Sequence, residues 1–317
     1  MTSSKRHATY LLAVFALSVI IRLFQITAYA DNSFGVGLIW SYDQNTHTLS
    51  ISASGELNEM PDFDDPENDL LSDELPPWNN VINDVETVRI ENGVLNIGMN
   101  AFYGSKSLKT VIISDGLTII GSGAFSKCSA LKSVVLPDTL KSIGADSFAE
   151  CISLNDPLFP VNLNVIGSGA FSGCISIKNL RLSQNVTTIM PLAFSGCGNV
   201  EKIDVSDKNP VYLSIGNCLI DRNKKSLIFG CKNSVIPSDG TVTSIEPYAF
   251  YNCNGLESIN VPQINGNKFH ICEGAFAGCL SLKNVRYFGN KSELEILLKY
   301  NTDNNNEPLK NADRQCF

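Results

Sequence analysis

A phenylalanine recurs at a fixed spacing of 23 residues through the middle of this chain. The spacing holds at Phe102, Phe125, Phe148, Phe171 and Phe194, and the same motif returns at Phe250 and Phe276 after irregular gaps. A period of this length predicts a repeat architecture, in which each unit packs only against its neighbours. A stack of such units is an elongated array rather than a single closed core.

The repeat extends well beyond the phenylalanine. An isoleucine stands five residues before each one, and an alanine directly precedes it in six of the seven units. A cysteine follows three residues later in all units except the first, which has Ser105; these cysteines are Cys128, Cys151, Cys174, Cys197, Cys253 and Cys279. Agreement at several offsets in seven units makes chance a poor explanation.

One unit shows why the spacing suits a stacked coil. Leu131–Pro137 has the composition of a short strand, and Leu140 and Ile143 form a second run that faces inward. Gly144 allows a tight turn, and Phe148 then packs into the interior. One coil cannot bury both of its faces, so coils must stack at about 4.8 Å per strand to create a continuous core.

The period lies in the range of leucine-rich repeats, so we predict an α/β leucine-rich-repeat solenoid. Strands should dominate, with little true helix and about seven coils. We expect a signal peptide over residues 1–30, an N-terminal β cap over 31–84 and the solenoid over 85–290. An insertion is expected at about 207–237, and a C-terminal helical cap and tail over 291–317.

The ends of a solenoid must be capped to cover its core. Leu38–Tyr42 and Thr48–Ser52 are expected to be strands of the first cap, with the aromatic ring of Trp78 lying over the first coil. Ser292–Tyr300 has helical apolar spacing and should cover the last coil, with Asn301–Glu307 as a loop.

The gap between Phe194 and Phe250 predicts a hairpin, because two apolar runs flank the polar stretch Asp221–Ser226. These runs are Cys218–Ile220 and Leu227–Phe229. A degenerate coil and a half remains an alternative.

The first thirty residues are typical of an export signal. Lys5 and Arg6 precede the apolar run Tyr10–Ile21, and Ala28-Tyr29-Ala30 supplies the small residues that signal peptidase needs. Uncleaved anchoring in a membrane is the alternative reading. We expect an extracellular or cell-surface protein with no membrane span in the mature chain.

Charge and residue types exclude several classes of function. Cleavage would remove three of the 24 basic residues and none of the 32 acidic ones, so the net charge would fall from −8 to −11. An acidic chain of this kind is a poor nucleic-acid binder, which needs clustered Lys and Arg. We predict no cofactor, no metal site and no catalytic residues, because His47 and His270 lie far apart and no Cys-x-x-Cys pair occurs.

The ten cysteines suggest disulfides in an exported protein. We reject pairing for the six repeat cysteines, because equivalent positions in stacked coils do not offer disulfide geometry. A ladder of free thiols is expected instead, while Cys218 and Cys231 could pair across the insertion.

Taken together, these residues resemble the BspA-like leucine-rich-repeat family of bacterial and protozoan surface proteins. The resemblance rests on the Ile-Gly-x-x-x-Phe-x-x-Cys core at Ile143–Cys151, on Leu49–Gly55 and Pro77-Trp78, and on Tyr287–Asn290. It implies the fold and a role as a surface or secreted binding protein, with several members acting as adhesins. Met190, Glu246 and Cys272 depart from the glycine of the motif, and we expect them to alter only local turn geometry.

The outward face of the strands is the predicted binding surface, since outward residues alternate with core ones. An apolar strip flanked by basic residues should form there, on an otherwise acidic protein. Its members are Lys109, Ile112, Lys132, Val135, Leu158, Lys178 and Arg181.

We therefore expect a monomer that binds an extracellular protein or glycan through its strand face. A structural surface protein that assembles through solenoid packing is the first alternative. An exported hydrolase is the second.

Overall fold

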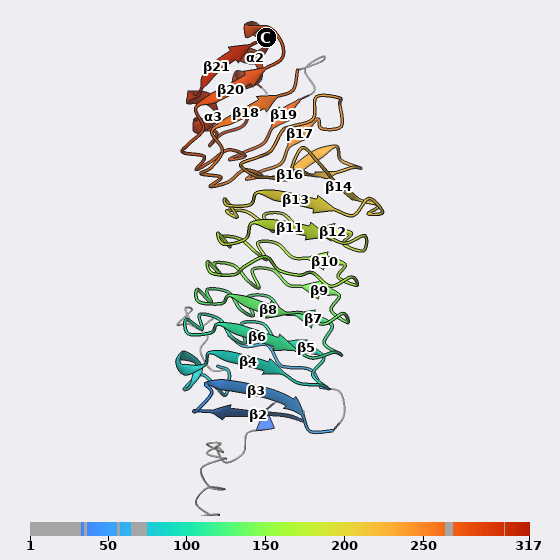
Figure 1. Cartoon of the computed structure of the whole chain (residues 1–317), viewed down its shortest axis with the longest axis vertical. Helices are drawn as coiled ribbons and strands as arrows, with labels where there is room; N and C mark the ends of the chain where they lie inside the picture. Colours follow the sequence, from blue (N-terminus) through green and yellow to red (C-terminus); the bar gives the residue numbers. More distant parts are fainter. Residues whose placement is uncertain (1–32, 35–36, 56–57, 65–74, 264–268, 301) are drawn as a thin grey trace, which may run out of the picture.

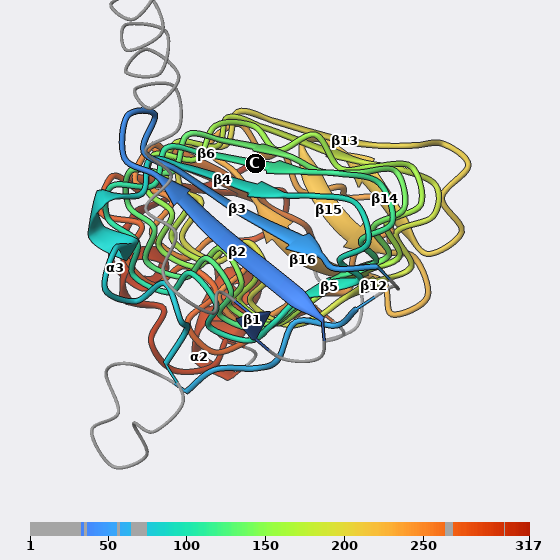
Figure 2. The same ribbon diagram turned by 90° about the horizontal axis from the view of Figure 1, so that it is seen from below.

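The computed structural model describes residues 33–317 except 35–36, 56–57, 65–74, 264–268 and 301. The chain is an elongated stack of coils, with the N-terminal β2 and β3 at one end and the C-terminal α2 and α3 at the other (Figure 1). Viewed along the long axis, successive coils superimpose (Figure 2). The described residues make about nine turns, two more than the sequence predicted, because the cap strands and the hairpin also join the stack.

One sheet runs along the face that the repeat predicted as strands. Its order is β1-β2-β3-β4-β6-β8, and its strands are β1 (Ser33–Phe34), β2 (Leu38–Asp43), β3 (Thr48–Ala53), β4 (Thr87–Ile90), β6 (Thr110–Ile113) and β8 (Ser133–Val135). The β2 and β3 strands pair antiparallel, whereas β3, β4, β6 and β8 are parallel. The N-terminal strands therefore extend the solenoid sheet.

A second ladder of two-residue strands runs along another side of the coils. Its members are β5 (Asn96–Ile97), β7 (Ile119–Ile120), β9 (Ser142–Ile143), β10 (Val165–Ile166) and β12 (Thr188–Ile189). Each carries the repeat isoleucine, paired in register with that of the next coil. The isoleucines thus form one buried column, apart from the half-buried Ile189 at its end.

The first sheet is interrupted after β8. Pro157 stands at the position of a central strand residue and has no N–H to contribute to a ladder. The parallel pairing resumes one coil later between β11 (Asn179–Leu182) and β13 (Lys202–Val205).

The predicted hairpin is present, with a third strand that the sequence analysis missed. β15 (Cys218–Asp221) pairs antiparallel with β16 (Ser226–Gly230), and β14 (Tyr212–Ile215) pairs antiparallel with β15. β16 then pairs in parallel with β17 (Ser244–Ile245), which pairs with β19 (His270–Ile271). The insertion therefore supplies one strand of the stack.

The C-terminal end contains the expected helix, α2 (Lys291–Tyr300), and more structure than a tail. α3 (Glu307–Asn311) is followed by β21 (Asp313–Cys316), which pairs in parallel with β20 (Asn284–Tyr287); β20 in turn pairs with β18 (Ser258–Val261). The last residues thus add a strand to the sheet. A short 3-10 helix spans Ile82–Asp84 near the other end.

Stacked aromatic rings occupy the interior of the coils. Neighbouring phenylalanine rings from Phe102 to Phe194 are nearly parallel, with centroids 5.1–5.8 Å apart. Trp78 stacks on Phe102 at 5.4 Å and its Nε1–H donates to the Ala101 carbonyl at 2.9 Å, which confirms the predicted aromatic lid on the first coil. At the hairpin, Phe229 lies 5.7 Å from Phe194 but tilted by 47°, so the regular stack ends there.

Candidate binding surface

The predicted apolar strip lies on the outer side of the first sheet. Ile112 is directly opposite Val135 in the parallel register of β6 and β8, and Leu158 follows in the same column on the coil that Pro157 keeps from forming a strand. Val135 and Leu158 are 55% and 73% exposed, whereas Ile112 is less exposed and half-buried. Exposed apolar side chains at adjacent positions of a rigid face make this column a candidate contact surface.

The basic residues expected beside this strip are exposed, but Lys109 is engaged by a neighbour. Its Nζ lies 2.7 Å from a carboxylate oxygen of Glu86, and the hydrogen bond from Lys109 lowers the pKa of that carboxyl. Lys132, Lys178 and Arg181 are also exposed. Within the described ranges, no ion pair within 4 Å involves these three side chains. Of the four basic residues expected in the patch, Lys109 is therefore the one that pairs with a carboxylate within 4 Å in the described ranges.

Asp156 fixes the backbone beside Leu158. Its carboxylate accepts hydrogen bonds from the amides of Lys178 and Asn179 at 2.6 and 2.8 Å and from the Asn179 side chain at 2.6 Å. Burial alone would raise the pKa of Asp156, but these hydrogen bonds and the charge of Arg181 lower it. The carboxylate thus replaces the strand pairing lost at Pro157 and holds the exposed Leu158 on an ordered coil.

The structure also contains a pocket that the sequence analysis missed. A cavity of about 280 Å³ opens where the last regular coil meets the hairpin. Apolar side chains line most of it, with one cation and one carboxylate; the lining includes Met190, Leu192, Phe194, Phe229, Tyr248, Lys224 and Glu246. The replacement of the repeat glycine by Met190, followed by Pro191, was the available signal.

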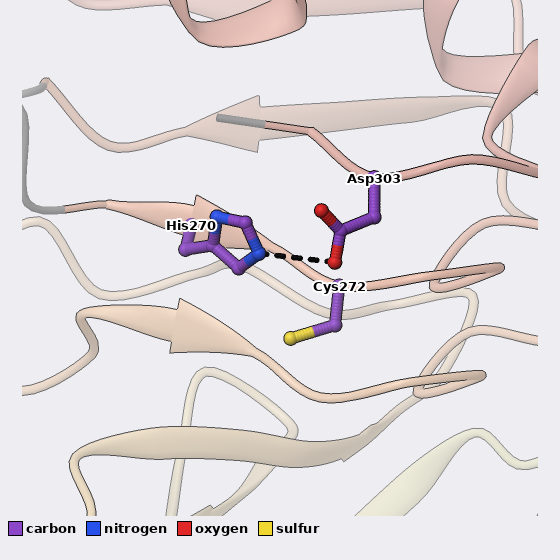
Figure 3. A group of neighbouring side chains, drawn as sticks. All are labelled: His270, Cys272 and Asp303. Carbon is purple, nitrogen blue, oxygen red and sulfur yellow. Dashed lines mark hydrogen bonds and ion pairs between the residues drawn. The ribbon is translucent and has the colours of Figure 1, made fainter. Parts of the chain in front are cut away.

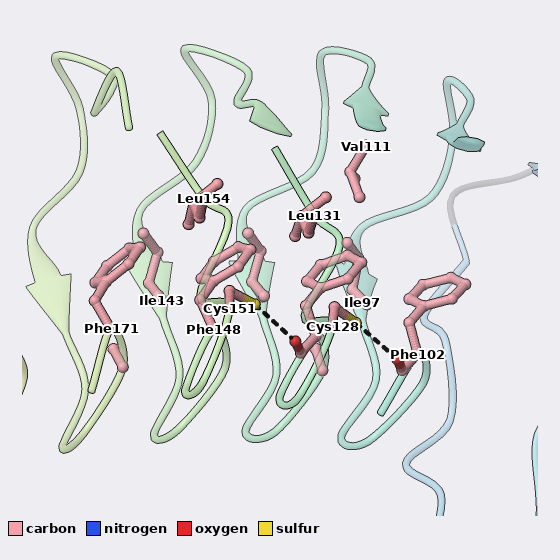
Figure 4. Close-up of a cluster of buried hydrophobic side chains, with 14 of the residues drawn as sticks. Ile97, Phe102, Val111, Cys128, Leu131, Ile143, Phe148, Cys151, Leu154 and Phe171 are labelled. Atoms are coloured by element: carbon pink, nitrogen blue, oxygen red, sulfur yellow. Dashed lines mark hydrogen bonds between the residues drawn. The ribbon is translucent and has the colours of Figure 1, made fainter. Parts of the chain in front are cut away.

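The repeat cysteines are structural. All ten cysteines of the chain are free, including Cys218 and Cys231 beside the hairpin. The thiol of Cys128 donates to the Phe102 carbonyl at 3.1 Å, and the next thiols repeat this contact along the ladder (Figure 4). Burial raises the pKa of Cys128 and of Cys197 to about 12, so these thiols stay protonated and unsuited to nucleophilic attack.

The His47 side chain contacts two groups of the N-terminal cap. Its Nδ1 lies 3.1 Å from both the Tyr42 hydroxyl and the Asp84 carbonyl oxygen, which ties the first hairpin turn to the coil below. Residues 65–74 lie outside the described part of the chain, as does the whole predicted signal peptide. Asp62 accepts a hydrogen bond from the Met99 amide at 2.7 Å.

Among the helices that the structure describes, none is both long enough and apolar enough to span a bilayer.

Comparison with known proteins agrees with the repeat. A family model described as the BspA type leucine rich repeat region, in six copies, matches residues 81–219 and 220–303. No curated protein matches the chain.

Solved structures share the fold, among them two crystal structures. A leucine-rich repeat protein from Eubacterium ventriosum aligns with a TM-score of 0.62 at 22% identity, over 80% of this chain and 71% of the other. The pneumococcal vaccine antigen PcpA aligns with a TM-score of 0.56 at 20% identity, over 74% of this chain and 56% of that one. Identities this low support similarity of fold alone.

Proposed function

Because this chain belongs to the BspA-type leucine-rich-repeat family, we propose that it is a secreted or surface-displayed binding protein. Its partner is an extracellular protein that presents acidic side chains around an apolar contact, and it docks on the strand face. The exposed apolar column at Val135 and Leu158 carries this proposal. Docking there removes apolar surface from water without any rearrangement of the stacked coils.

The charge distribution supports a partner with acidic groups. The chain is acidic overall, yet exposed Lys132, Lys178 and Arg181 lie on the same face as the apolar column. A local basic patch on an acidic molecule attracts a negatively charged partner and repels it elsewhere, which orients the encounter.

A binding array tests the proposal. The purified protein is applied to immobilised extracellular-matrix proteins and, in a separate panel, to glycans. Val135→Asp and Leu158→Asp should each weaken binding to a protein hit by at least about tenfold, because each places an unpaired charge at the contact. Lys132→Glu should also weaken binding to the protein hit, and it should reduce the dependence of that binding on salt concentration.

Ile119→Asp is the matched control. The exposed fraction of Ile119 is 47%, similar to that of Val135, but Ile119 lies on β7 in the second ladder. Loss of binding in the Val135 and Leu158 variants with retention in the Ile119 variant supports the strand face. Equal effects of all three, or hits confined to the glycan panel, would reject the proposed partner class.

Export is tested at the N-terminus. Expression in a bacterial host followed by N-terminal sequencing of the released protein should give Asp31 as the first residue. A product that stays in the membrane with an intact N-terminus would show anchoring instead.

A further inference from the structure

Three side chains with metal-ligating atoms meet near the C-terminal end of the solenoid (Figure 3). The ligand atoms of His270, Cys272 and Asp303 all lie within 4.8 Å of one another. His270 Nε2 and Asp303 Oδ2 are 3.1 Å apart. From this geometry we propose that His270, Cys272 and Asp303 form a binding site for a divalent transition-metal cation, with Zn²⁺ as the best match to the ligand set.

The site occurs because one column of equivalent positions in the stack holds larger side chains near the C-terminal end. In the regular coils this column holds glycine, since a Cβ on Gly144 would lie 2.7 Å from the main-chain carbonyl carbon of Gly121. Cys272 and Asp303 occupy the same column: their amides donate to Ile245 and Ile271, as the Gly144 amide donates to Ile120. Side chains thus replace glycine on consecutive coils.

The remaining ligand comes from the adjoining strand. His270 begins β19 and Cys272 directly follows it, so in this extended stretch the two side chains, two residues apart, project to the same side. A bridge between Ile271 and Thr302 fixes the neighbouring coil in register and brings Asp303 beside them. Three ligands on hydrogen-bonded backbone form a partly pre-organised site.

The chemistry of the three donors selects the ion. Zn²⁺ accepts imidazole nitrogen, thiolate sulfur and carboxylate oxygen at about 2.0–2.3 Å, which places the ligand atoms about 3.3–3.8 Å apart. The 3.1 Å nitrogen–oxygen pair is about 0.2 Å short of this range, and the widest pair, at no more than 4.8 Å, needs to close by roughly 1 Å. A hard cation such as Ca²⁺ or Mg²⁺ would prefer oxygen ligands alone.

Charge around the site favours a cation. Glu246 occupies the same column one coil earlier, so the carboxylates of Glu246 and Asp303 both lie near the Cys272 side chain. His270 and Asp303 are each nearly half exposed, which leaves a path from solvent to the ligands.

A Cys/His/Asp catalytic triad is the competing use of these residues. A nucleophilic cysteine needs a lowered pKa from a positive environment, whereas here the neighbours are carboxylates. The surroundings suit capture of a cation and disfavour a free thiolate.

The test is a titration of the purified, chelator-treated protein with Co²⁺ and with Zn²⁺. Co²⁺ should bind with one equivalent and give the near-ultraviolet charge-transfer band of a thiolate ligand, and Zn²⁺ should displace it. His270→Ser and Asp303→Asn should weaken binding by at least about tenfold, and Cys272→Gly should abolish the band. Glycine is the residue of the regular column, so the last variant restores the repeat.

Two control variants test whether Co²⁺ binds at other cysteine or histidine residues. Cys316→Ser removes the exposed cysteine of β21, and His47→Ala removes a histidine at the other end of the chain. Both should bind Co²⁺ as the unaltered protein does. Absence of the thiolate band in the unaltered protein, or a band that survives Cys272→Gly and disappears with Cys316→Ser, would overturn the site.

Calorimetric Zn²⁺ titration provides a second readout if a Co²⁺ band is obscured. Circular dichroism of each variant confirms that a loss of binding is not a loss of fold. Rapid alkylation of Cys272 by iodoacetamide at neutral pH in the metal-free protein would instead support a reactive thiol and reject the metal role.

Discussion

The thiol of Cys151 donates a hydrogen bond to the main-chain carbonyl oxygen of Phe125, one coil earlier, at 3.1 Å. The contact uses a carbonyl at the turn and keeps the sulfur buried and protonated. We therefore expect native protein at pH 8 to react with iodoacetamide at Cys316, which is exposed, and more slowly at the half-buried Cys272. The eight buried cysteines should stay unmodified.

Mass mapping after alkylation checks this, with urea-denatured protein as the control in which all ten cysteines should react. Labelling of Cys151 at the rate of Cys316 would contradict the structural role of the ladder. Disulfide-linked peptides from the unreduced protein would contradict it as well.

The same burial predicts a loss of stability at high pH. Cys128 and Cys197 have a pKa of about 12 in the folded chain, well above the ordinary value for a thiol. At a pH between the ordinary pKa of a thiol and the raised pKa of the folded chain, the unfolded chain releases a proton that the folded chain keeps. The contribution of each buried thiol to stability is therefore complete below pH 8 and is lost as pH rises. Each thiol should lower the free energy of unfolding by up to about 1.4 kcal/mol per pH unit.

Urea unfolding at pH 8, 9 and 10 measures this slope. Since Lys and Tyr also titrate at high pH, the informative quantity is the difference between variants. Cys128→Ala should show a shallower decline than the unaltered protein, and Cys316→Ser should show the same decline. Identical slopes in all three proteins would refute the prediction.

Much of the architecture was predictable from the sequence, because the repeated residues are the ones that pack in the interior of each coil. A buried column needs the same residue type at the same offset in each coil, and Phe102 to Phe194 satisfy this without exception. The lid formed by Trp78 followed from the need to cover the first ring. The exposed column at Val135 followed from the alternation of strand side chains.

The sequence was less informative where contacts do not follow the period. Asp303 lies 33 residues after His270, in a stretch predicted to be a loop, so nothing in the spacing brought it near Cys272. β14 and β21 are short and polar or mixed, and their pairing depends on neighbours placed by the stack. The salt bridge between Lys109 and Glu86 required the register of two coils, which only the structure gives.

Gly230 is predicted to be essential to the junction between the hairpin and the later coils. A Cβ at this position would lie 2.1 Å from the ring of Phe250, so even alanine forces the ring or the backbone to move. Gly230→Ala should reduce the free energy of unfolding by about 1–3 kcal/mol, the usual cost of overpacking. The urea midpoint should fall with little change in the m-value.

Gly255→Ala is the control, since Gly255 is exposed and the three atoms nearest to a Cβ there, at 2.9–3.6 Å, all belong to the side chain of Lys232 and not to a buried ring. It should change stability by less than about 0.5 kcal/mol, as surface substitutions generally do. Equal effects of the two substitutions would mean that contact with Phe250 does not limit the junction.

Asp156 is predicted to hold together the two halves of the interrupted sheet. In a regular coil the amides of Glu201 and Lys202 both donate to the Lys178 carbonyl, at 2.8 and 3.2 Å. In the coil before it, the amides of Lys178 and Asn179 donate to the Asp156 carboxylate instead. Asp156→Ala should therefore cost about 1–3 kcal/mol, because it removes a charged acceptor from two amides.

The dependence on pH distinguishes this carboxylate from a merely well-packed side chain. Burial opposes ionisation of Asp156, yet the hydrogen bonds from Asn179 and Lys178 lower its pKa, so its stabilising effect is present above the ordinary value and is lost as pH falls through the lowered one. The stability difference between the unaltered protein and Asp156→Ala should accordingly shrink in urea titrations run from pH 7 down to pH 3. Asp138→Ala, which removes an exposed carboxylate from the preceding coil, should show no such trend. If the two alanine variants behave alike at every pH, the sheet across Pro157 is held by stacking of the coils and not by this carboxylate.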